Sequence, residues 1–389
     1  MASKNLIVLI SISLFIWLFL LILWGGFWRC DQYIDENYSE LKSYPRVLVI
    51  VPARDEAEVI KHSLKSLLTQ NYLGDFLIVL VDDDSCDRTG EIAQETANQL
   101  NKAEQLKIIS GQPLIPGWKG KLWAINQGID YAIHQTLSPD YFLFTDADIY
   151  HHSENLSQLV TKAEAENLDL VSLMVLLRCI SFWEKLLIPA FVFFFQKLYP
   201  FPWVNNSQKS IAAAAGGCIL ISNKSLQAIG GIESIKDALI DDCSLAKAVK
   251  SQAKHIWIGL TRETISLRPY NDLKTIWDTI ARTAFTQLNY SWLLLIGTLI
   301  GMVVVYLVAP GGLIVGIQRN NWLLIGAAIS TWLLMTIAYI PTLRLYNLSI
   351  TWGFSLPAIA FLYTLMTIDS AVKYYQGKGG AWKGRTYTK

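Results

Sequence analysis

The sequence predicts an α/β domain with a mostly parallel sheet, with apolar helices on either side of it in the chain. Two observations lead to this prediction. Short apolar runs that end in acidic residues alternate with stretches of helical periodicity, and long uncharged runs occupy residues 5–28 and much of the chain after residue 290. Strands that alternate with helices are typical of a parallel sheet covered on both faces. The 389 residues suffice for one large domain plus membrane segments.

Composition points to a membrane-associated chain without a nucleic-acid partner. Hydrophobic residues make up 52% of the sequence, which includes 14 Trp and 17 Tyr. The formal net charge is +1 and no basic face dominates, so no electrostatic case for nucleic acid exists. The five cysteines show neither CxxC pairs nor metal-ligand spacing, which indicates reduced thiols in a cytosolic compartment.

Residues 5–28 are predicted to form a retained transmembrane anchor. The run 6–27 is almost uninterrupted in its apolar character and closes with Trp24, Trp28 and Arg29, as at a membrane interface. A cleaved signal peptide is the alternative. The run is longer than the apolar region of such peptides and lacks an obvious small-x-small cleavage site, so the anchor is favoured.

Residues 45–290 hold the predicted α/β domain. Its strands are expected at 47–51, 76–81 and 141–144, where apolar residues run without interruption for strand length. Helices are expected after each strand, from Asp55, over 87–100 and from about Ser153. Each strand ends in a polar cluster. Because ligands of such sheets bind beyond the carboxyl ends of the strands, the three clusters are expected to meet at one edge.

Asp146 and Asp148 are the first candidate site. They follow the third strand at alternate positions, so both carboxylates can face one ion. Oxygen ligands of this kind suit Mg²⁺ or Mn²⁺ shared with nucleotide phosphates, and a solvated turn is the alternative. The acids on neighbouring strands favour the metal, with Asp148 as the direct ligand and Asp146 nearer the ribose. Either His151 or His152 could approach the ion, although exposed loop histidines are the more common case.

The segment after the second strand and a later lysine are candidate nucleotide contacts. Asp82 and Asp83 are expected to face the base or ribose, or to help hold the metal. Asp84 or Asp87 could instead cap the following helix. Lys121 lies in a glycine-containing stretch between the second and third strands, which we expect to be a phosphate-binding loop; a solvated lysine is the alternative.

Asp241 and Asp242 follow an apolar segment and precede a helical pattern. Capping of that helix is one interpretation. The other is that one carboxylate acts as a base while its neighbour raises its pKa. Arg268 and Arg282 precede the C-terminal apolar blocks, where a guanidinium could stabilise a leaving diphosphate.

Three further regions are assigned to the membrane. Residues 181–204 are apolar and aromatic but interrupted by polar residues, which predicts an interfacial helix, with a core helix as the alternative. Residues 291–372 contain three blocks of near-spanning length, and the first is expected to be re-entrant or interfacial because it contains Ala-Pro-Gly-Gly at 309–312. The tail, 373–389, is basic and is therefore expected in the cytosol. If the α/β domain shares that side, the number of C-terminal crossings must be even.

In their order, these motifs resemble those of family 2 glycosyltransferases, which are inverting enzymes with the GT-A nucleotide-sugar fold. The resemblance covers roughly residues 45–282 and rests on Pro-Ala-Arg-Asp-Glu at 52–56, Asp-Asp-Asp-Ser at 82–85, Lys-x-x-Ala-x-Asn at 121–126, Asp-Ala-Asp at 146–148 and Asp-Asp at 241–242. It implies nucleotide contacts by Pro52, Arg54, Glu56, Asp82 and Asp83, a diphosphate contact by Lys121, a DxD metal site at Asp146 and Asp148, and Asp242 as the general base.

Two departures from the family pattern limit the comparison. Asp241 stands where the family often has Glu. In the (Q/R)xxRW signature, Thr283 follows Arg282 where Trp is expected, and the Gln or Arg expected three residues before Arg282 is absent. The broken signature weakens the case for a processive polysaccharide synthase. It leaves Arg282 as a candidate diphosphate contact.

The stretches 187–196, 213–218 and 281–288 are similar to the hopanoid-biosynthesis-associated membrane glycosyltransferases of bacteria. The resemblance thus implies a multi-pass protein of the cell membrane, with its catalytic domain facing the cytoplasm. It would move a hexose from a nucleotide-diphospho-sugar to a lipid hydroxyl, with Mg²⁺ or Mn²⁺. The alternatives are a processive polysaccharide synthase and a non-catalytic lipid-binding protein with a nucleotide fold.

Overall fold

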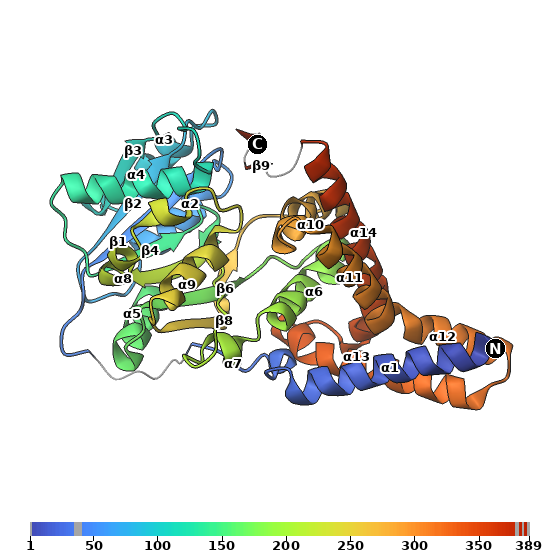
Figure 1. The fold of residues 1–389 in the computed structure, drawn as a ribbon. Helices are drawn as coiled ribbons and strands as arrows, with labels where there is room; N and C mark the ends of the chain where they lie inside the picture. The colour runs from blue at the N-terminus through green and yellow to red at the C-terminus, as the bar shows by residue number, and fades with distance from the viewer. Residues whose placement is uncertain (1, 35–40, 378–380, 383–384, 387–389) are drawn as a thin grey trace.

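The computed structural model describes residues 2–34, 41–377, 381–382 and 385–386. An α/β domain lies beside a group of long apolar helices (Figure 1). The domain is built on an eight-stranded sheet in the order β3-β2-β1-β4-β7-β6-β8-β5. Its strands are β1 (Val47–Ala53), β2 (Phe76–Asp82), β3 (Leu106–Ser110), β4 (Tyr141–Thr145), β5 (Ile149–Tyr150), β6 (Leu170–Leu176), β7 (Cys218–Ser222) and β8 (Ile256–Ser266).

The sheet is mostly parallel, as predicted. Strands β3, β2, β1 and β4 are parallel, and β6 and β8 run in the same direction, while β7 and β5 are antiparallel to their neighbours. The three predicted strands are β1, β2 and β4, which are adjacent in the sheet. Ala53 pairs with Asp82 and Ile50 pairs with Phe144, so the three polar clusters do lie at one edge.

Alternate residues of each central strand face two separate cores. Leu48 and Ile50 of β1 pack with α4 and α9 on one side, and Val47 and Val49 pack with α2, α3 and α5 on the other. The sheet is therefore covered on both faces, which accounts for strands that are apolar at every position. The helices of the domain are α2 (Ile60–Leu68), α3 (Thr89–Gln99), α4 (Gly120–His134), α5 (Asn155–Glu166), α7 (Phe201–Val204), α8 (Asn223–Ala228), α9 (Asp241–Ser251) and α10 (Leu273–Gln287), with short η2 (Ala103–Gln105) and η3 (Ile232–Ile235).

Five helical stretches of the described chain are long and apolar enough to cross a membrane, judged by length and composition alone. They are 5–23, 182–204, 292–318, 322–345 and 350–375. The elements concerned are α1 (Ala2–Leu23), α6 (Phe182–Leu198), α11 (Trp292–Met302), η4 (Val303–Leu307), α12 (Val308–Gln318), α13 (Trp322–Leu345), η5 (Ile350–Ser355) and α14 (Leu356–Tyr375); η1 (Phe27–Arg29) follows α1.

Helices α1, α12 and α13 form one bundle that points away from the α/β domain (Figure 1). Ile10, near the start of α1, packs against Leu324 and Ala328, near the start of α13. At the other end, the Cys30 thiol lies 3.4 Å from the Thr342 hydroxyl. Helices α1 and α13 therefore run in the same direction, and α12, joined to α13 by the short turn at 319–321, runs against both.

The first C-terminal block is one bent helix, and the expected re-entrant turn does not form in it. Helices α11 and α12 are joined by the π-helical segment η4. Pro310 has no N–H, and a π-helical turn just before a proline relieves the strain on the helix. The Val305 carbonyl accepts hydrogen bonds from α1, at 2.9 Å from Trp17 Nε1 and 3.3 Å from Ser13 Oγ. The bend is thus stabilised by polar contacts from a neighbouring helix.

Helix α14 crosses the domain-facing end of this bundle and packs along α10 (Figure 1). The two helices share charged side chains, since Lys373 Nζ lies 2.9 Å from both Asp278 and Asp369. The Trp277 indole donates to Asp369 at 2.8 Å. Of the predicted basic tail, 373–389, residues 378–380, 383–384 and 387–389 lie outside the described residues; Ala381–Trp382 and Arg385–Thr386 form a small hairpin, β9–β10.

Helix α6 lies between the α/β domain and the apolar helices. Ser181 and Glu184 form a capping box at its start. The buried Glu184 carboxylate also accepts from the Tyr270 N–H at 2.8 Å and from the Arg178 guanidinium at 2.6 Å. More than half of its most apolar stretch is buried inside the protein. An interfacial position for 181–204 stays a prediction.

Candidate active site

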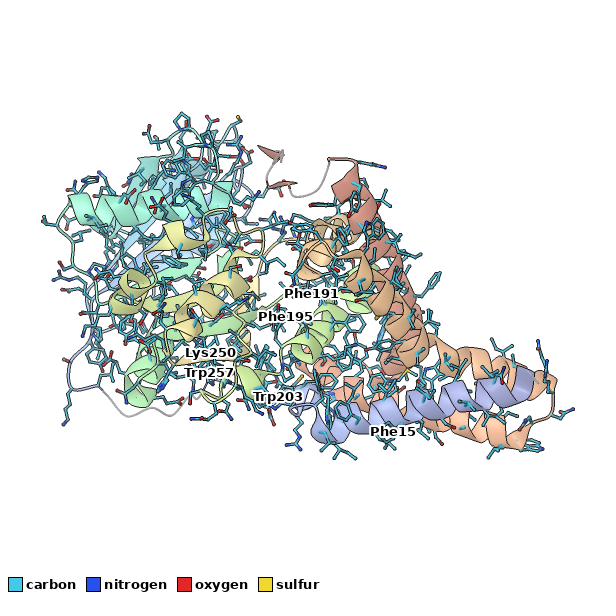
Figure 2. The ribbon with its side chains drawn as sticks, viewed as in Figure 1. Phe15, Phe191, Phe195, Trp203, Lys250 and Trp257 are labelled. Atoms are coloured by element: carbon cyan, nitrogen blue, oxygen red, sulfur yellow. The ribbon has the colours of Figure 1, made fainter. Side chains whose placement is uncertain are left out.

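A cavity of about 480 Å³ opens at the carboxyl ends of β1 and β4. One side is polar and contains most of the predicted site residues, namely Pro52, Glu56, Lys121, Asp146, Asp148, Asp241, Asp242, Arg268 and Arg282. The other side is apolar and comes from α6 and α10. Phe191 and Phe195 lie on the side of α6 that faces the α/β domain (Figure 2). The cavity therefore offers charged and apolar surfaces to the same ligand space.

Lys121 joins the third-strand acids to the later acidic pair. Its ammonium lies 2.8 Å from Asp146 and 3.4 Å from Asp241. Burial alone would lower the pKa of Lys121, but the two carboxylates raise it above its ordinary value, so the side chain stays cationic. The prediction that Lys121 lies in a loop is wrong, because Lys121 is the second residue of α4. The first turn of a helix also favours anionic ligands.

Asp148 forms a second ionic group with residues that are distant in sequence. Arg268, two residues beyond β8, donates from Nε to Asp148 at 2.8 Å and from Nη2 to Glu56 at 2.7 Å. Ser266 Oγ lies 3.4 Å from the same Asp148 oxygen. The Asp148 side chain is only 8% exposed, whereas that of Asp146 is 37% exposed. The guanidinium thus neutralises the more buried acid of the DxD pair.

Asp146 and Asp148 fit a divalent ion that completes its coordination with oxygens of a bound diphosphate. Both carboxylates line one cavity, and hard oxygen donors suit Mg²⁺ and Mn²⁺. Within the described part of the chain, no group of three or more His, Cys, Asp or Glu side chains is arranged to hold a metal. The protein alone therefore offers few ligands, and the nucleotide would supply the others.

Asp242 lies in the first turn of α9 and faces the cavity. Its Oδ1 accepts from the Cys243 N–H at 2.7 Å, and its Oδ2 accepts from the Gly216 N–H at 2.9 Å. Burial, and then the neighbouring Asp241 charge, raise the pKa of Asp242 to about 6. A Cβ at Gly216 would lie 3.1 Å from Lys121 Nζ and 3.4 Å from Asp242, so a side chain here would press on the Lys121 ammonium. The structure therefore holds the Asp242 carboxylate in a fixed orientation.

Three predicted nucleotide contacts lie outside the cavity lining. Arg54 is 3.8 Å from the Asp83 carboxylate and hydrogen-bonds to the Asp83 carbonyl. Asp82, at the end of β2, accepts from the Ser85 N–H at 3.1 Å. These side chains form a polar group beside the cavity, at the ends of β1 and β2. Asp87 accepts a hydrogen bond from the Thr89 N–H at 3.2 Å, at the first residue of α3. It therefore contacts the start of this helix, as expected for the alternative in which Asp84 or Asp87 caps the helix.

The expectation of exposed loop histidines is wrong for His151, which is 1% exposed. Its Nε2 lies 2.9 Å from Thr145 Oγ1 and its Nδ1 lies 2.9 Å from Asn155 Nδ2. Burial lowers the pKa of His151 to about 3, so the ring is neutral. Both ring nitrogens are engaged, which leaves His151 with a structural role. His152 is 38% exposed and lies 3.4 Å from Glu263.

The apolar wall contains residues that were not singled out as site residues from the sequence. They are Ile188, Phe191 and Phe195 of α6 with Ile276 and Ile280 of α10. A signal was present, because Phe191/Phe195 and Ile276/Ile280 are spaced four residues apart and so share one face of each helix. Arg282, on the same helix α10, is exposed and lines the cavity, and no ion pair or hydrogen bond of its side chain is found among the described residues.

This sheet order, with acidic residues gathered at the carboxyl ends of adjacent parallel strands, defines a GT-A-type α/β fold. Residues 48–230 match the family model "Glycosyl transferase family 2". The match therefore supports the predicted family for residues 48–230 of this chain.

Similarity to individual proteins agrees with this assignment. The probable glycosyltransferase YdaM of Bacillus subtilis is 36% identical over 132 residues, which are 32% of this chain and 30% of YdaM. The 4,4'-diaponeurosporenoate glycosyltransferase of Staphylococcus haemolyticus is 30% identical over 119 residues, 31% of this chain and 28% of the relative. The chain thus spans about a third of the length of these curated relatives.

A solved structure shares the fold over nearly the whole chain. It is the mannosyltransferase PcManGT from Pyrobaculum calidifontis, in complex with GDP-Man and Mn²⁺. The TM-score is 0.55 at 17% identity, and the match covers 96% of this chain and 99% of PcManGT. At this identity the likeness concerns the fold, including its apolar helices.

Proposed function

We propose that this protein is a membrane-embedded, inverting hexosyltransferase that moves a sugar from a nucleotide-diphospho-sugar to a hydroxyl group of a lipid. The observation that carries the proposal is the position of Asp242, between the cationic, acid-rich edge of the sheet and the apolar wall of α6 and α10. This edge suits a diphosphate, and the wall suits an apolar acceptor. A base between the two can accept the proton of an acceptor hydroxyl that lies next to the bound sugar donor.

Asp242 is the proposed general base. Its pKa of about 6 leaves the carboxylate ionised at neutral pH, yet basic enough to accept a proton as the acceptor oxygen attacks. The N–H groups of Gly216 and Cys243 each engage one of its oxygens and hold it in place. The acceptor oxygen forms a bond with the anomeric carbon while the bond from that carbon to the diphosphate oxygen breaks. This single displacement inverts the anomeric configuration.

Cationic side chains would stabilise the leaving diphosphate. Lys121 is held by Asp146 and Asp241 at the edge of the cavity, and Arg282 is exposed toward the same space. Fixed charges aimed at the developing negative charge lower the barrier without reorganisation. A divalent ion held by Asp146 and Asp148 would add Lewis-acid stabilisation of the same diphosphate when bound.

The apolar wall favours a lipid acceptor over a polysaccharide. Phe191, Phe195 and Ile280 provide an apolar surface, which a polar polymer of sugars would cover less favourably than a lipid would. The resemblance of 187–196, 213–218 and 281–288 makes a hopanoid the first acceptor to test. The name of the staphylococcal relative, 4,4'-diaponeurosporenoate glycosyltransferase, makes the carboxylate that it names the next acceptor to test.

We further propose that three helices cross the bilayer, namely α1, the bent helix α11–α12, and α13. Each of these is uncharged over a length that suffices for the hydrocarbon core. In α14, Lys373 forms ion pairs with Asp278 of α10 and with Asp369 of its own helix, and Lys274 of α10 is 87% exposed. Charges at this position are costly in hydrocarbon. The uncharged part of α14 itself, 356–368, is 13 residues, about 20 Å at 1.5 Å per residue, so it reaches a crossing length near 30 Å only together with η5.

This arrangement leaves two C-terminal crossings, the even number that the parity argument required. Helix α14 would lie at the interface on the side of the α/β domain, which we propose faces the cytoplasm. The turn at 319–321 would lie on the opposite side.

Labelling with a membrane-impermeant maleimide tests this topology. Asn320→Cys should react in intact cells. Gln376→Cys, and the native exposed Cys86 as an internal control, should react only after lysis. Labelling of Gln376→Cys in intact cells would contradict the assignment of α14.

The activity is tested with purified full-length protein, Mn²⁺ and a panel of nucleotide-diphospho-hexoses, with hopanoid lipids as acceptors and mass spectrometry of the products. We expect one donor to yield a glycolipid, and Asp242→Asn to lower the rate about 10²- to 10⁴-fold, as is typical for the loss of a general base. A wild-type rate for Asp242→Asn would refute the proposed role. Transfer to soluble oligosaccharides with no lipid product would favour the polysaccharide synthase.

A further inference from the structure

We propose that Arg268 acts as a built-in cation at the metal site and makes binding of the divalent ion depend on the nucleotide. The inference rests on the proposed function for its metal site, but it concerns the protein before any substrate binds. Arg268 contacts Asp148 at 2.8 Å and Glu56 at 2.7 Å, through different nitrogens of one guanidinium. It therefore occupies an oxygen of Asp148, the carboxylate that a metal would otherwise use.

The position of Arg268 is fixed by the surrounding backbone. The N–H of Leu267 donates to the Asp148 carbonyl at 2.7 Å, and Ser266, at the end of β8, contacts the Asp148 carboxylate. On the other side, the Tyr270 N–H is held by the buried Glu184. The backbone that carries Arg268 is thus tied to the strand end that bears Asp148 and to α6, which places the guanidinium beside Asp148.

The remaining acid of the pair is also neutralised, because Asp146 is 2.8 Å from the Lys121 ammonium. In the protein without nucleotide, a divalent ion must therefore compete with one cation at each carboxylate. A diphosphate changes this balance, since its oxygens attract Arg268, Lys121 and the metal together. We infer that the nucleotide precedes or accompanies the ion, and that the empty protein binds Mn²⁺ weakly.

Removal of the guanidinium should reverse this order. In Arg268→Ala, Asp148 loses its guanidinium partner, and a largely buried carboxylate without that cation attracts a metal ion more strongly. We expect Mn²⁺ alone, without nucleotide, to bind Arg268→Ala roughly ten-fold more tightly or better than wild type. Arg268→Lys, which keeps the charge, should remain near wild type.

Arg282→Ala is the matched control, because it removes a positive charge from the same cavity but not from the acids. Free Mn²⁺ is measured by electron paramagnetic resonance in a titration of each full-length variant in detergent, and thermal unfolding checks that each is folded. Equal Mn²⁺ affinity of Arg268→Ala and wild type would overturn the proposal. So would an equal gain in Arg282→Ala, because the effect would then be one of overall charge.

The readout separates this proposal from the proposed function. If no sugar transfer is found but Arg268→Ala gains Mn²⁺ affinity, the proposal about Arg268 stands and the proposed reaction is wrong. If transfer occurs but the gain is absent, only the Arg268 proposal fails.

Discussion

The pH dependence of sugar transfer depends on Asp242 and on the acid beside it. With a pKa of about 6, about nine tenths of the molecules hold an ionised Asp242 at pH 7, and about one tenth do at pH 5. A general base must be ionised to accept a proton, so activity is lost as the pH falls through the pKa. We therefore expect kcat/KM to drop roughly ten-fold between pH 7 and pH 5. With an ordinary aspartate pKa, the same interval would change it by less than about a tenth.

Asp241→Asn provides the perturbation. The Asp241 charge raises the pKa of Asp242, so its removal should move the acidic limb of the profile to lower pH. The exposed Asp237→Asn, four residues earlier and outside the cavity lining, is the control and should leave the limb in place.

The assay is the initial rate of glycolipid formation at subsaturating donor from pH 4.5 to 8, with constant Mn²⁺ and ionic strength. The reasoning is refuted if the wild-type profile is flat between pH 5 and pH 7. It is also refuted if Asp241→Asn moves the acidic limb upward.

Three further outcomes follow from the described contacts. Chelation by EDTA should abolish transfer, with recovery in Mn²⁺ or Mg²⁺ for wild type but not for Asp148→Asn, as measured by product formation; recovery in the variant would exclude Asp148 as a ligand. Glu184→Ala leaves buried donors, including the Tyr270 N–H, without their acceptor, and should destabilise the protein by about 3–5 kcal/mol in denaturant unfolding. His151→Phe removes two buried hydrogen bonds and should cost about 1–3 kcal/mol. Its Mn²⁺ affinity should stay within two-fold of wild type, and a larger loss would make His151 a ligand.

The strands that could be predicted from the sequence are those buried on both faces. Strands β1, β2 and β4 are continuous apolar runs followed at once by acids, so both their length and their direction could be read. Strand β5 contains two residues, which is too short for a distinct pattern, and β7, although as long as β4, is not followed by acids. Helix α9 begins at Asp241, so the predicted helix after the acidic pair is correct.

The electrostatic pairing within the site could not be predicted, because it depends on tertiary structure. Glu56 and Arg268 are 212 residues apart and meet only because β8 ends beside β5, next to the end of β4. The sequence suggested a nucleotide contact for Glu56 and a diphosphate contact for Arg268, and their mutual ion pair had no signal. Likewise, Asp369 and Lys373 come at the end of an apolar block, where charged residues would also follow a membrane-spanning helix. Only the contacts of this part of α14 with α10 indicate that α14 lies at the interface instead.

The packing between the α/β domain and the membrane helices has a practical consequence for protein production. Leu345 and Tyr346, at the end of α13, are buried in the main core of the α/β domain together with Cys30. Tyr33 forms a bridge with Leu260 of β8, and the Leu260 N–H donates to the Gln32 carbonyl at 2.7 Å. A fragment limited to residues 45–290 would lose these residues and expose the core surface that they cover. Truncation to a soluble catalytic fragment should therefore yield an aggregating product, and crystallisation or screening requires the full chain in detergent or lipid.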